Sequence, residues 1–584
     1  MKSINYILSR IVAGSLAVGL VACDLEEYNP GGNTADTVWS TEQGFKTIVN
    51  GAYHYQRNFY GKEDAIFMTE AGTDLWFNAN RASYANQLTR YEGFTPDASG
   101  TMNNSFRTFY TAISHANEGI NRIGEVPFSS PEERARREGE LRFLRGFYYW
   151  HVVETWGGIN LKLDTEPGFT AERSSVQAFY DVIIADLEFA AANLPNQNFW
   201  AAEYSRASKK SALGFLAKAL LSRAYYSEGA EREQYFARAR DVANDIINRK
   251  GELGIDLYPR FAENFATANL LNARNHKEAM YIISNSNNQS LNFDLNSNRL
   301  HLWHMTQYGN KPALQQTLEY GQDNQRRLMP TLALLDFYEA DELDTRYQAS
   351  FQEVWLANAN NNFTLTAPIV ALLRKDPSLT GRVIRTGAGG TPRDTAMVIT
   401  RRRLTGERFM PYVAIDRDSV YATESNNAIK SGADFVRLKK FHDPNRVTPT
   451  TQAGFNDIIL MRFAEIYLIA AEAEHQLGNN QRAAELINVI RTRAAVPGRE
   501  AEMQIGPERI SIDFILDERA RELAGEHTRW FDLKRTRTLV DRIARYNPDI
   551  TAVREFHMLR PVPQGEIDAL LNGDEFAQNP GYVQ

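Results

Sequence analysis

Cysteine is almost absent from this chain of 584 residues, in which Cys23 is the only one. A single cysteine excludes an intramolecular disulfide framework and a cluster of cysteine metal ligands. The ten histidines are scattered, and no His-Glu-x-x-His sequence occurs. The common signatures of metal-dependent hydrolases are therefore missing, and we expect neither a metal nor a cofactor.

Positive charge is also in short supply. The chain has 65 Lys and Arg against 72 Asp and Glu, a formal net charge of −7. Binding to nucleic acid requires a clustered basic surface, so this balance argues against a nucleic-acid partner. No apolar run after residue 22 reaches the length of about 20 residues that a membrane-spanning helix needs. We expect no spanning helix in the body of the protein.

The N-terminal segment has the three parts of an export signal. Lys2 and Arg10 supply the positive part, residues 11–22 are mostly apolar, and Cys23 follows small residues. This order predicts a signal peptide over residues 1–22 and acyl chains on Cys23 that anchor the protein to a membrane. Loss of Lys2 and Arg10 would take the net charge from −7 to −9. The alternative is an ordinary cleaved signal with an incidental cysteine.

Helical periodicity dominates both ends of the remaining chain. A stripe of Phe236, Ala239, Ala243 and Ile246 recurs at intervals of three and four residues, which is typical of one buried helix face. The same pattern predicts helices at about 41–57, 102–124, 132–155, 174–193, 207–228, 231–250, 331–338 and 458–477, and a further helix that carries residues 483–494.

Adjacent helices with small residues and short turns indicate helical hairpins. Leu477-Gly478-Asn479 separates the last two predicted helices, and Gly229 is a candidate stop for the helix at 207–228. Such hairpins are the unit of tetratricopeptide-type repeats, although no strict 34-residue period is visible. We predict a mostly α fold of degenerate tetratricopeptide-like helical hairpins that form one globule.

The middle of the chain has a different composition. Residues 251–457 are rich in Asn, Thr, Gly and Gln, with short β-type runs at 279–283 and 435–438. Loops of this length are usually functional or disordered. We therefore expect five parts: 1–22 signal peptide, 23–38 acylated tether, 39–250 N-terminal helical part, 251–457 loop-rich ligand-binding insertion with short strands, and 458–584 C-terminal helical part and tail.

Three weak motifs favour ordinary structural explanations. His301 and His304 could be metal ligands on one helix face, but two solvent-facing loop histidines are favoured. The glycine-rich segment 387–390 lacks the Lys-Ser/Thr of a phosphate loop and is interpreted as a flexible turn. The acidic pairs 341–342 and 517–518 are interpreted as solvated faces, since the sequence does not place two carboxylates across a cleft.

Several segments together resemble the SusD/RagB family of lipid-anchored nutrient-binding proteins of the Bacteroidetes outer membrane. They follow the family's order along nearly the whole chain after the signal. The matching segments are Leu141–Trp150, Trp156–Leu161, Glu166-Pro167, Pro330–Tyr338, Asp344–Arg346, Arg462–Gly478, Ala483–Ala494, Glu518–Glu526, Arg529–Arg535, Pro561–Gln564 and Gln578–Tyr582. Asn160 stands where the family usually has proline. The charges at 519–532 have spacings that allow i,i+3 and i,i+4 ion pairs, so we interpret this motif as structural.

The resemblance implies a binding protein at the outer membrane that captures its cargo and passes it into a barrel, with no chemistry of its own. Its implied partners are a SusC-like TonB-dependent outer-membrane barrel, an oligosaccharide or less often a peptide, and the membrane itself through the acyl chains. It implies a location at the cell outer membrane, facing the cell surface. We expect no catalytic residues.

Sugar binding requires exposed aromatic rings and polar groups on loops. Two segments, 74–91 and 301–320, combine them. The candidate ligand-binding residues are Trp76, Asn78, Arg81, Tyr84, Trp303, Tyr308 and Asn310. The alternative is that Trp76 and Trp303 are core residues beneath long loops. Rival functions are a RagB-like peptide-capturing variant, a helical-repeat scaffold that binds only another protein, and a secreted glycoside-degrading enzyme.

Overall fold

The computed structural model describes residues 38–79, 83–97, 100–165, 168–288, 291, 298–422, 428–430 and 432–582. The predicted signal, the tether with Cys23, and Arg81 lie outside these residues. Within the described ranges, every helix is too short or too polar to cross a lipid bilayer.

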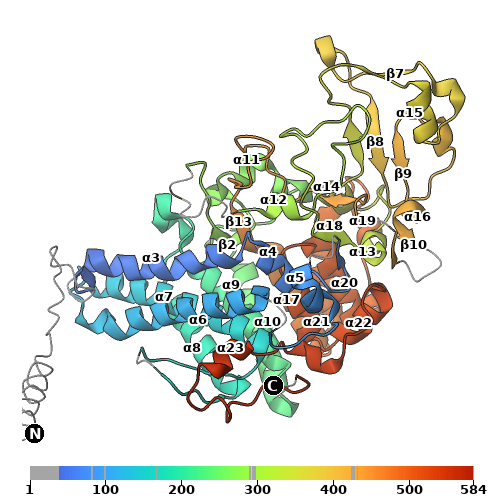
Figure 1. Ribbon diagram of the computed structural model, residues 1–584. Helices are drawn as coiled ribbons and strands as arrows, with labels where there is room; N and C mark the ends of the chain where they lie inside the picture. The colour runs from blue at the N-terminus through green and yellow to red at the C-terminus, as the bar shows by residue number, and fades with distance from the viewer. Residues whose placement is uncertain are drawn as a thin grey trace, which may run out of the picture.

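Long helices pack in chain order to form the body of the molecule. Each contacts the next, so that consecutive pairs form antiparallel hairpins, and α10 packs directly on α17 although about 215 residues separate them (Figure 1). This is the predicted tetratricopeptide-like, mostly α fold. The helices are α3 (Glu42–Phe59), α6 (Gly100–Arg122), α7 (Pro131–Trp156), α8 (Val176–Asn193), α9 (Lys209–Ala224), α10 (Gly229–Asn248), α17 (Phe463–Gln476) and α18 (Asn480–Ala494).

Local sequence signals explain where these helices begin and how closely they pack. Ser130 accepts a hydrogen bond from the Glu133 amide and Pro131 occupies the first turn of α7, a favourable start for a helix. A Cβ at Gly146 would lie 3.3 Å from the Leu187 side chain on α8. Glycine there lets α7 and α8 approach closely. The predicted stripe of α10 is buried at all four positions.

Two predicted helix boundaries are wrong. Gly229 does not stop the preceding helix: α9 ends at Ala224, and Gly229, with φ of +51°, begins α10. The helix predicted from residue 458 begins at Phe463. The five residues before it form β13 (Ile458–Arg462), antiparallel to β2 (Ala279–Ile283). Their branched apolar side chains suit a buried strand, and a continuous apolar run does not distinguish strand from helix.

Shorter helices complete the helical layers on both sides of the body. They are α4 (Glu63–Thr69), α5 (Ser83–Arg90), α11 (Thr267–Leu270), α12 (Leu300–Trp303), α13 (Leu332–Phe337), α14 (Arg346–Ser350), α19 (Glu500–Met503), α20 (Ile512–Leu523), α21 (Arg529–Arg535), α22 (Leu539–Tyr546) and α23 (Gln564–Asp568). The described strands fall between residues 76 and 462 and make several small sheets. In the body these are β1 (Trp76–Asn78) with β3 (Leu328–Pro330), β2 with β13, and β4 (Phe351–Gln352) with β12 (Arg437–Leu438).

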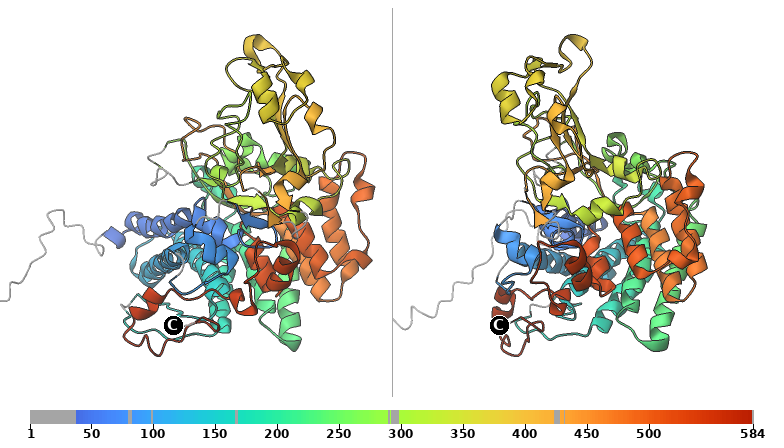
Figure 2. Two further views of the ribbon diagram at one scale, coloured as in Figure 1. Left: turned by 45° about the vertical axis from the view of Figure 1, so that its right-hand side comes forward. Right: turned by 90° about the vertical axis from the view of Figure 1, so that its right-hand side faces the viewer.

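Residues 354–420 form a lobe that projects from the helical body (Figure 1, Figure 2). We call this region the projecting lobe. Its three-stranded sheet has the order β5-β8-β9, in which β8 is antiparallel to β5 and parallel to β9. Its elements are β5 (Val354–Leu356), β6 (Phe363–Thr364), α15 (Ala367–Leu372), β7 (Val383–Ile384), β8 (Thr395–Ile399), β9 (Val413–Ile415) and α16 (Arg417–Val420), and the adjoining β10 (Tyr421–Ala422) pairs with β11 (Ala428–Ile429).

The C-terminal charges form a buried network between elements. Arg462 bonds to Glu278, Glu522 and Glu526 at 2.9, 3.0 and 2.7 Å. Arg346 bonds to Glu518 at 2.7 Å. We call these residues the buried ionic network. They link α14, β13 and α20 in the core.

Only some of the charges at residues 519–532 pair at the i,i+3 or i,i+4 spacing that the sequence allows. α20 ends at Leu523, so Arg519 reaches Asp532 across a turn, at 2.7 Å. The pair Arg521–Glu518 does follow the i,i+3 spacing within α20. Glu518, expected on a solvated face, is fully buried. Its ion pairs with arginines from other elements compensate the cost of removing its charge from water.

Candidate functional site

Four of the predicted ligand-binding side chains lie in the core. Trp76, Trp303 and Tyr308 are 0% exposed, and Asn78 is buried beside Thr89, to which its amide donates a hydrogen bond of 3.1 Å. The expectation that these side chains are exposed on loops is wrong. β1 pairs with β3 along its whole length, and all of its residues are buried. The two tryptophans are the core residues that the alternative described.

The two predicted segments nevertheless meet in space. The Ala79 amide donates to the Arg327 carbonyl at 2.8 Å, and the Arg327 amide donates to the Trp303 carbonyl at 2.9 Å. The ring of Trp76 lies 5.4 Å from that of His304. The two sequence segments therefore share one region of the fold, held together through their buried rings.

Two predicted residues do face solvent. Tyr84 on α5 is 43% exposed, and Asn310 is exposed after α12. Partial burial raises the pKa of Tyr84 to about 12, with a further contribution from Asp64 and an opposing one from Arg299. These charges thus lie close enough to the phenol to act on it. We call Tyr84, Asp64 and Arg299 the Tyr84 surface.

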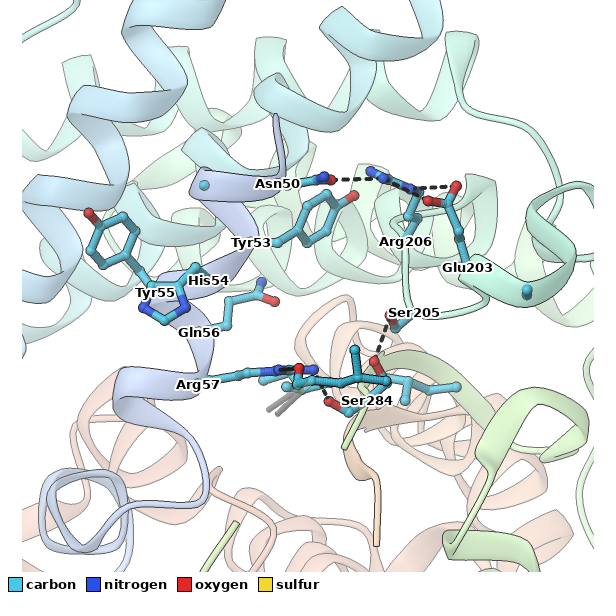
Figure 3. Close-up of a pocket in the computed structure, with 15 residues that line it drawn as sticks. Asn50, Tyr53, His54, Tyr55, Gln56, Arg57, Glu203, Ser205, Arg206 and Ser284 are labelled. Atoms are coloured by element: carbon cyan, nitrogen blue, oxygen red, sulfur yellow. Dashed lines mark hydrogen bonds and ion pairs between the residues drawn. The ribbon is translucent and has the colours of Figure 1, made fainter. Parts of the chain in front are cut away.

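A larger concave site, which the sequence did not indicate, lies along α3. We call it the α3 cavity; its volume is about 830 Å³. Figure 3 shows aromatic and polar side chains of α3 along one wall and Glu203 and Arg206 opposite them. It is lined by Asn50, Gly51, Tyr53, His54, Tyr55, Gln56, Arg57, Ala202, Glu203, Ser205, Arg206, Ile282, Ile283, Ser284 and Leu291.

Hydrogen bonds hold the charged groups of the α3 cavity in place. Arg206 donates to Glu140 at 2.9 Å and to Asn50 at 2.8 Å. The Tyr53 hydroxyl donates to the same carboxylate at 2.9 Å. Arg57 donates to the Ser284 carbonyl at 2.5 Å, and burial lowers the pKa of this guanidinium from its ordinary value. The walls of the cavity are therefore fixed by bonds between distant segments.

Aromatic rings lie beside these polar groups. Tyr55 is half-buried, with its ring centre 5.1 Å from that of His115 and 5.5 Å from that of His54. Partial burial raises the pKa of the Tyr55 phenol. A cavity that combines rings with a few fixed polar groups is typical of small-ligand sites. The signal available in the sequence was the run Asn50–Arg57, where tyrosines, histidine and arginine interrupt an otherwise ordinary amphipathic helix.

The predicted histidine pair lies in the core. His301 and His304 are 6% and 2% exposed, so the expectation of two solvent-facing loop histidines is wrong. α12 places His304 between Trp76 and Phe441, and burial lowers its pKa to about 3, which keeps the imidazole neutral. Among the described residues, no group of three or more His, Cys, Asp or Glu is arranged to hold a metal ion.

Similar proteins are found by sequence and by fold. A SusD-like protein of Formosa agariphila is 25% identical over 550 residues, which cover 92% of each chain. A SusD-like protein of Bacteroides ovatus is 27% identical over 176 residues, 29% of this chain and 31% of its own. Among solved structures, a laminarin-binding SusD-like protein aligns with a TM-score of 0.65 at 18% identity, over 93% of this chain and 100% of its own.

Family models cover both halves of the chain. Residues 25–221 match the family described as starch-binding and associating with the outer membrane. Residues 291–582, half of the chain, match the model of the SusD family. The fold, with its paired helices and short strands, agrees with that of the SusD-like neighbours. The chain belongs to the SusD family.

Proposed function

We propose that this protein captures a glycan at the cell surface and delivers it to a SusC-like TonB-dependent outer-membrane transporter, without cleaving it. Family membership supports this proposal, as do two similar solved structures: one is a laminarin-binding SusD-like protein and the other is a surface glycan-binding protein. Acyl chains on Cys23 would hold the protein at the outer membrane.

The observation that carries the proposal is the composition of the α3 cavity. Tyr53, His54 and Tyr55 offer rings for the apolar face of a pyranose, and Asn50 and Arg57 offer groups for its hydroxyls. Hydrogen bonds hold Arg57 and Arg206 before any ligand arrives. Preorganised groups reduce the entropy lost on binding. A volume of about 830 Å³ accommodates an oligosaccharide segment.

The Tyr84 surface is a second candidate position for the same function. Its exposed ring has a carboxylate and a guanidinium close by, but it lies outside the α3 cavity. Asn310 also stays a candidate because its side chain is exposed. Trp76 and Trp303 are unsuitable probes, since truncation of a buried tryptophan destabilises a protein by about 3–5 kcal/mol.

The test is a binding measurement with one variant at each position. Purified mature protein is titrated by calorimetry with a panel of neutral oligosaccharides and peptides. We expect Tyr55→Ala to weaken glycan binding about tenfold, equal to about 1.4 kcal/mol. Phe409→Ala is the matched control, because this aromatic ring is 58% exposed on the projecting lobe. It should bind like the wild type.

Each result separates one part of the proposal. Loss of binding in Tyr84→Ala with none in Tyr55→Ala would move the site to the Tyr84 surface. Binding of peptides in place of glycans would favour the RagB-like variant. Cleaved products in the incubated ligand would contradict a role without catalysis.

Two further experiments test the anchor and the delivery. Retention of the Cys23→Ser variant in the membrane fraction would contradict the lipid anchor. Failure to isolate a barrel protein together with the membrane-bound protein would contradict delivery to a transporter.

A further inference from the structure

A second cavity of about 580 Å³ lies on the other side of the segment that forms one wall of the α3 cavity. Ala202, Glu203, Ser205 and Arg206 line the α3 cavity, whereas Ala201 and Tyr204 line this one. The remaining walls come from residues 196–198, 250–256 and 274–277, together with Lys210. We call it the Lys210 cavity.

Lys210 is the unusual group in this cavity. The residue as a whole is 3% exposed and lines the cavity, and among the described residues no hydrogen bond or ion pair to its ammonium group is found. Buried charges are normally paired, because removing a charge from water is costly. Burial accordingly lowers the pKa of Lys210 to about 7. At neutral pH the amine is therefore only partly protonated, and a bound anion would favour its protonated, charged form.

The position of Lys210 on its helix adds to this effect. It is the second residue of α9, a helix of 16 residues. The positive end of a helix dipole disfavours an ammonium group and favours an anion. The start of α9 is capped by Ser208 and Ser211, so a bound anion would compensate chiefly the charge of Lys210. This placement therefore suits an anionic ligand better than an empty cavity.

The other charged groups of the cavity leave an excess of positive charge. Lys250 pairs with Asp256 at 2.7 Å, and Glu252 pairs outside the lining with Arg249 at 2.8 Å. Arg274 and Lys277 contribute two more cations to the lining. His276 stays neutral, because burial lowers its pKa and its ring accepts a hydrogen bond from the Ala279 amide.

Neutral hydrogen-bonding groups accompany these cations. Asn198 and Asn275 line the cavity and are exposed, so their amides can bond to hydroxyl groups. Tyr204 supplies a ring at the shared wall, with its hydroxyl donated to Asp457 at 2.7 Å. A ligand that carries one carboxylate or sulfate group among several hydroxyls would match this set.

We propose that the Lys210 cavity binds the anionic group of an acidic saccharide, a carboxylate or a sulfate ester, through the Lys210 ammonium group. This inference rests on the proposed capture of glycans and adds a charge preference to it. Because the two cavities share residues 201–206 as a wall, a branched or long glycan could occupy both while its neutral part lies in the α3 cavity.

The test compares three probes at constant ionic strength in chloride. Glucuronate supplies the carboxylate on a sugar, glucose supplies the sugar alone, and acetate and sulfate supply the anion alone. We expect the full mature protein to bind glucuronate, and Lys210→Met to weaken that binding at least tenfold. Lys210→Arg, which keeps the charge, should restore part of it. Lys209→Met is the matched control, because this neighbouring lysine does not line the cavity.

The outcomes of this test can be told apart from the outcomes of the binding test at the α3 cavity. Unchanged glucuronate binding in Lys210→Met, with a native circular dichroism spectrum, would overturn the proposal. Equal affinity for acetate, sulfate and glucuronate would also overturn it, since the site would then be one for free anions. Glucuronate binding that survives Tyr55→Ala but not Lys210→Met would support it even if neutral glycans fail to bind anywhere.

Discussion

The buried ionic network and the ion pairs of the projecting lobe use the same side chains in different surroundings. Arg462 and Arg346 are at most 1% exposed, and their carboxylate partners are buried with them. In the lobe, the arginine side chains of the pairs Arg403–Asp418 and Arg408–Asp376 are 65% and 63% exposed. Burial therefore decides how much an arginine–carboxylate pair contributes to the stability of the fold: breaking a buried pair is costly, whereas breaking an exposed one changes little.

This difference teaches how to interpret the family motif. Charged residues in a binding protein are easily taken for ligand contacts. Here those of residues 518–532 connect α20 to β13, α14 and α21 in the interior. The candidate ligand groups lie elsewhere, on α3 and around α9, where the charges reach a cavity.

Removal of the Arg462 guanidinium should have the largest effect on stability. Arg462→Met leaves Glu278, Glu522 and Glu526 without one of their partners in the core. We expect the free energy of unfolding to fall by about 3–5 kcal/mol, the usual cost of breaking a buried pair. Denaturant unfolding measures it. A loss below about 1 kcal/mol would contradict the contrast between the two regions.

Acid should destabilise the protein through the network more than through the lobe. Burial by itself raises the pKa of Glu522, but the guanidinium groups of Arg493, Arg462 and Arg346 lower it to about 2. Its stabilising contribution is complete above the ordinary value of 4.5 and is lost as the pH falls toward 2. We expect Glu522→Gln to remove on the order of 2 kcal/mol of this acid dependence.

The lobe supplies the matched control for that measurement. The hydrogen bond from Arg408 lowers the pKa of Asp376 to about 2 as well, but this carboxylate is open to solvent. Water and salt screen such a pair. Asp376→Asn should leave the profile of stability against pH as in the wild type. A flattened profile in this variant would show that exposure does not separate the two groups of charges.

Loss of an unpaired buried charge should stabilise the protein. A lysine whose pKa is depressed in the folded state destabilises that state as the pH falls from about 10.5 toward 7. Lys210→Met should therefore be more stable than the wild type by about 1–2 kcal/mol at pH 7, and equal to it near pH 11. Thermal unfolding at both values tests this. A variant less stable at pH 7 would indicate a partner for Lys210.

The smallest effect is expected in the projecting lobe. Arg403→Met removes an exposed pair with Asp418, and pairs so open to solvent contribute little to the free energy of unfolding. That contribution should vanish in 1 M salt, where the screening length is about 3 Å. The same salt should leave the deficit of Arg462→Met almost unchanged. Equal salt dependence in both variants would remove the distinction between buried and exposed pairs.

The sequence by itself determined the helical part of the fold. Stripes such as Phe236–Ile246 and the break at Leu477–Asn479 act through neighbours on the same helix, so their spacing is enough to locate the elements. The family motifs identified the architecture because their aromatic and charged residues make the contacts between these helices. The start of α17 was missed, since an apolar run serves a strand and a helix equally well.

Only the tertiary structure decided which side chains reach solvent. Trp76 and Trp303 have the composition of a sugar-binding loop around them, yet both rings are buried, Trp76 on β1 where it pairs with β3 and Trp303 on α12. Tyr55 and Lys210 lie on helices with no unusual sequence pattern. The other walls of their cavities come from segments far away in the chain. Exposure depends on contacts between residues far apart in the chain, which local spacing does not encode.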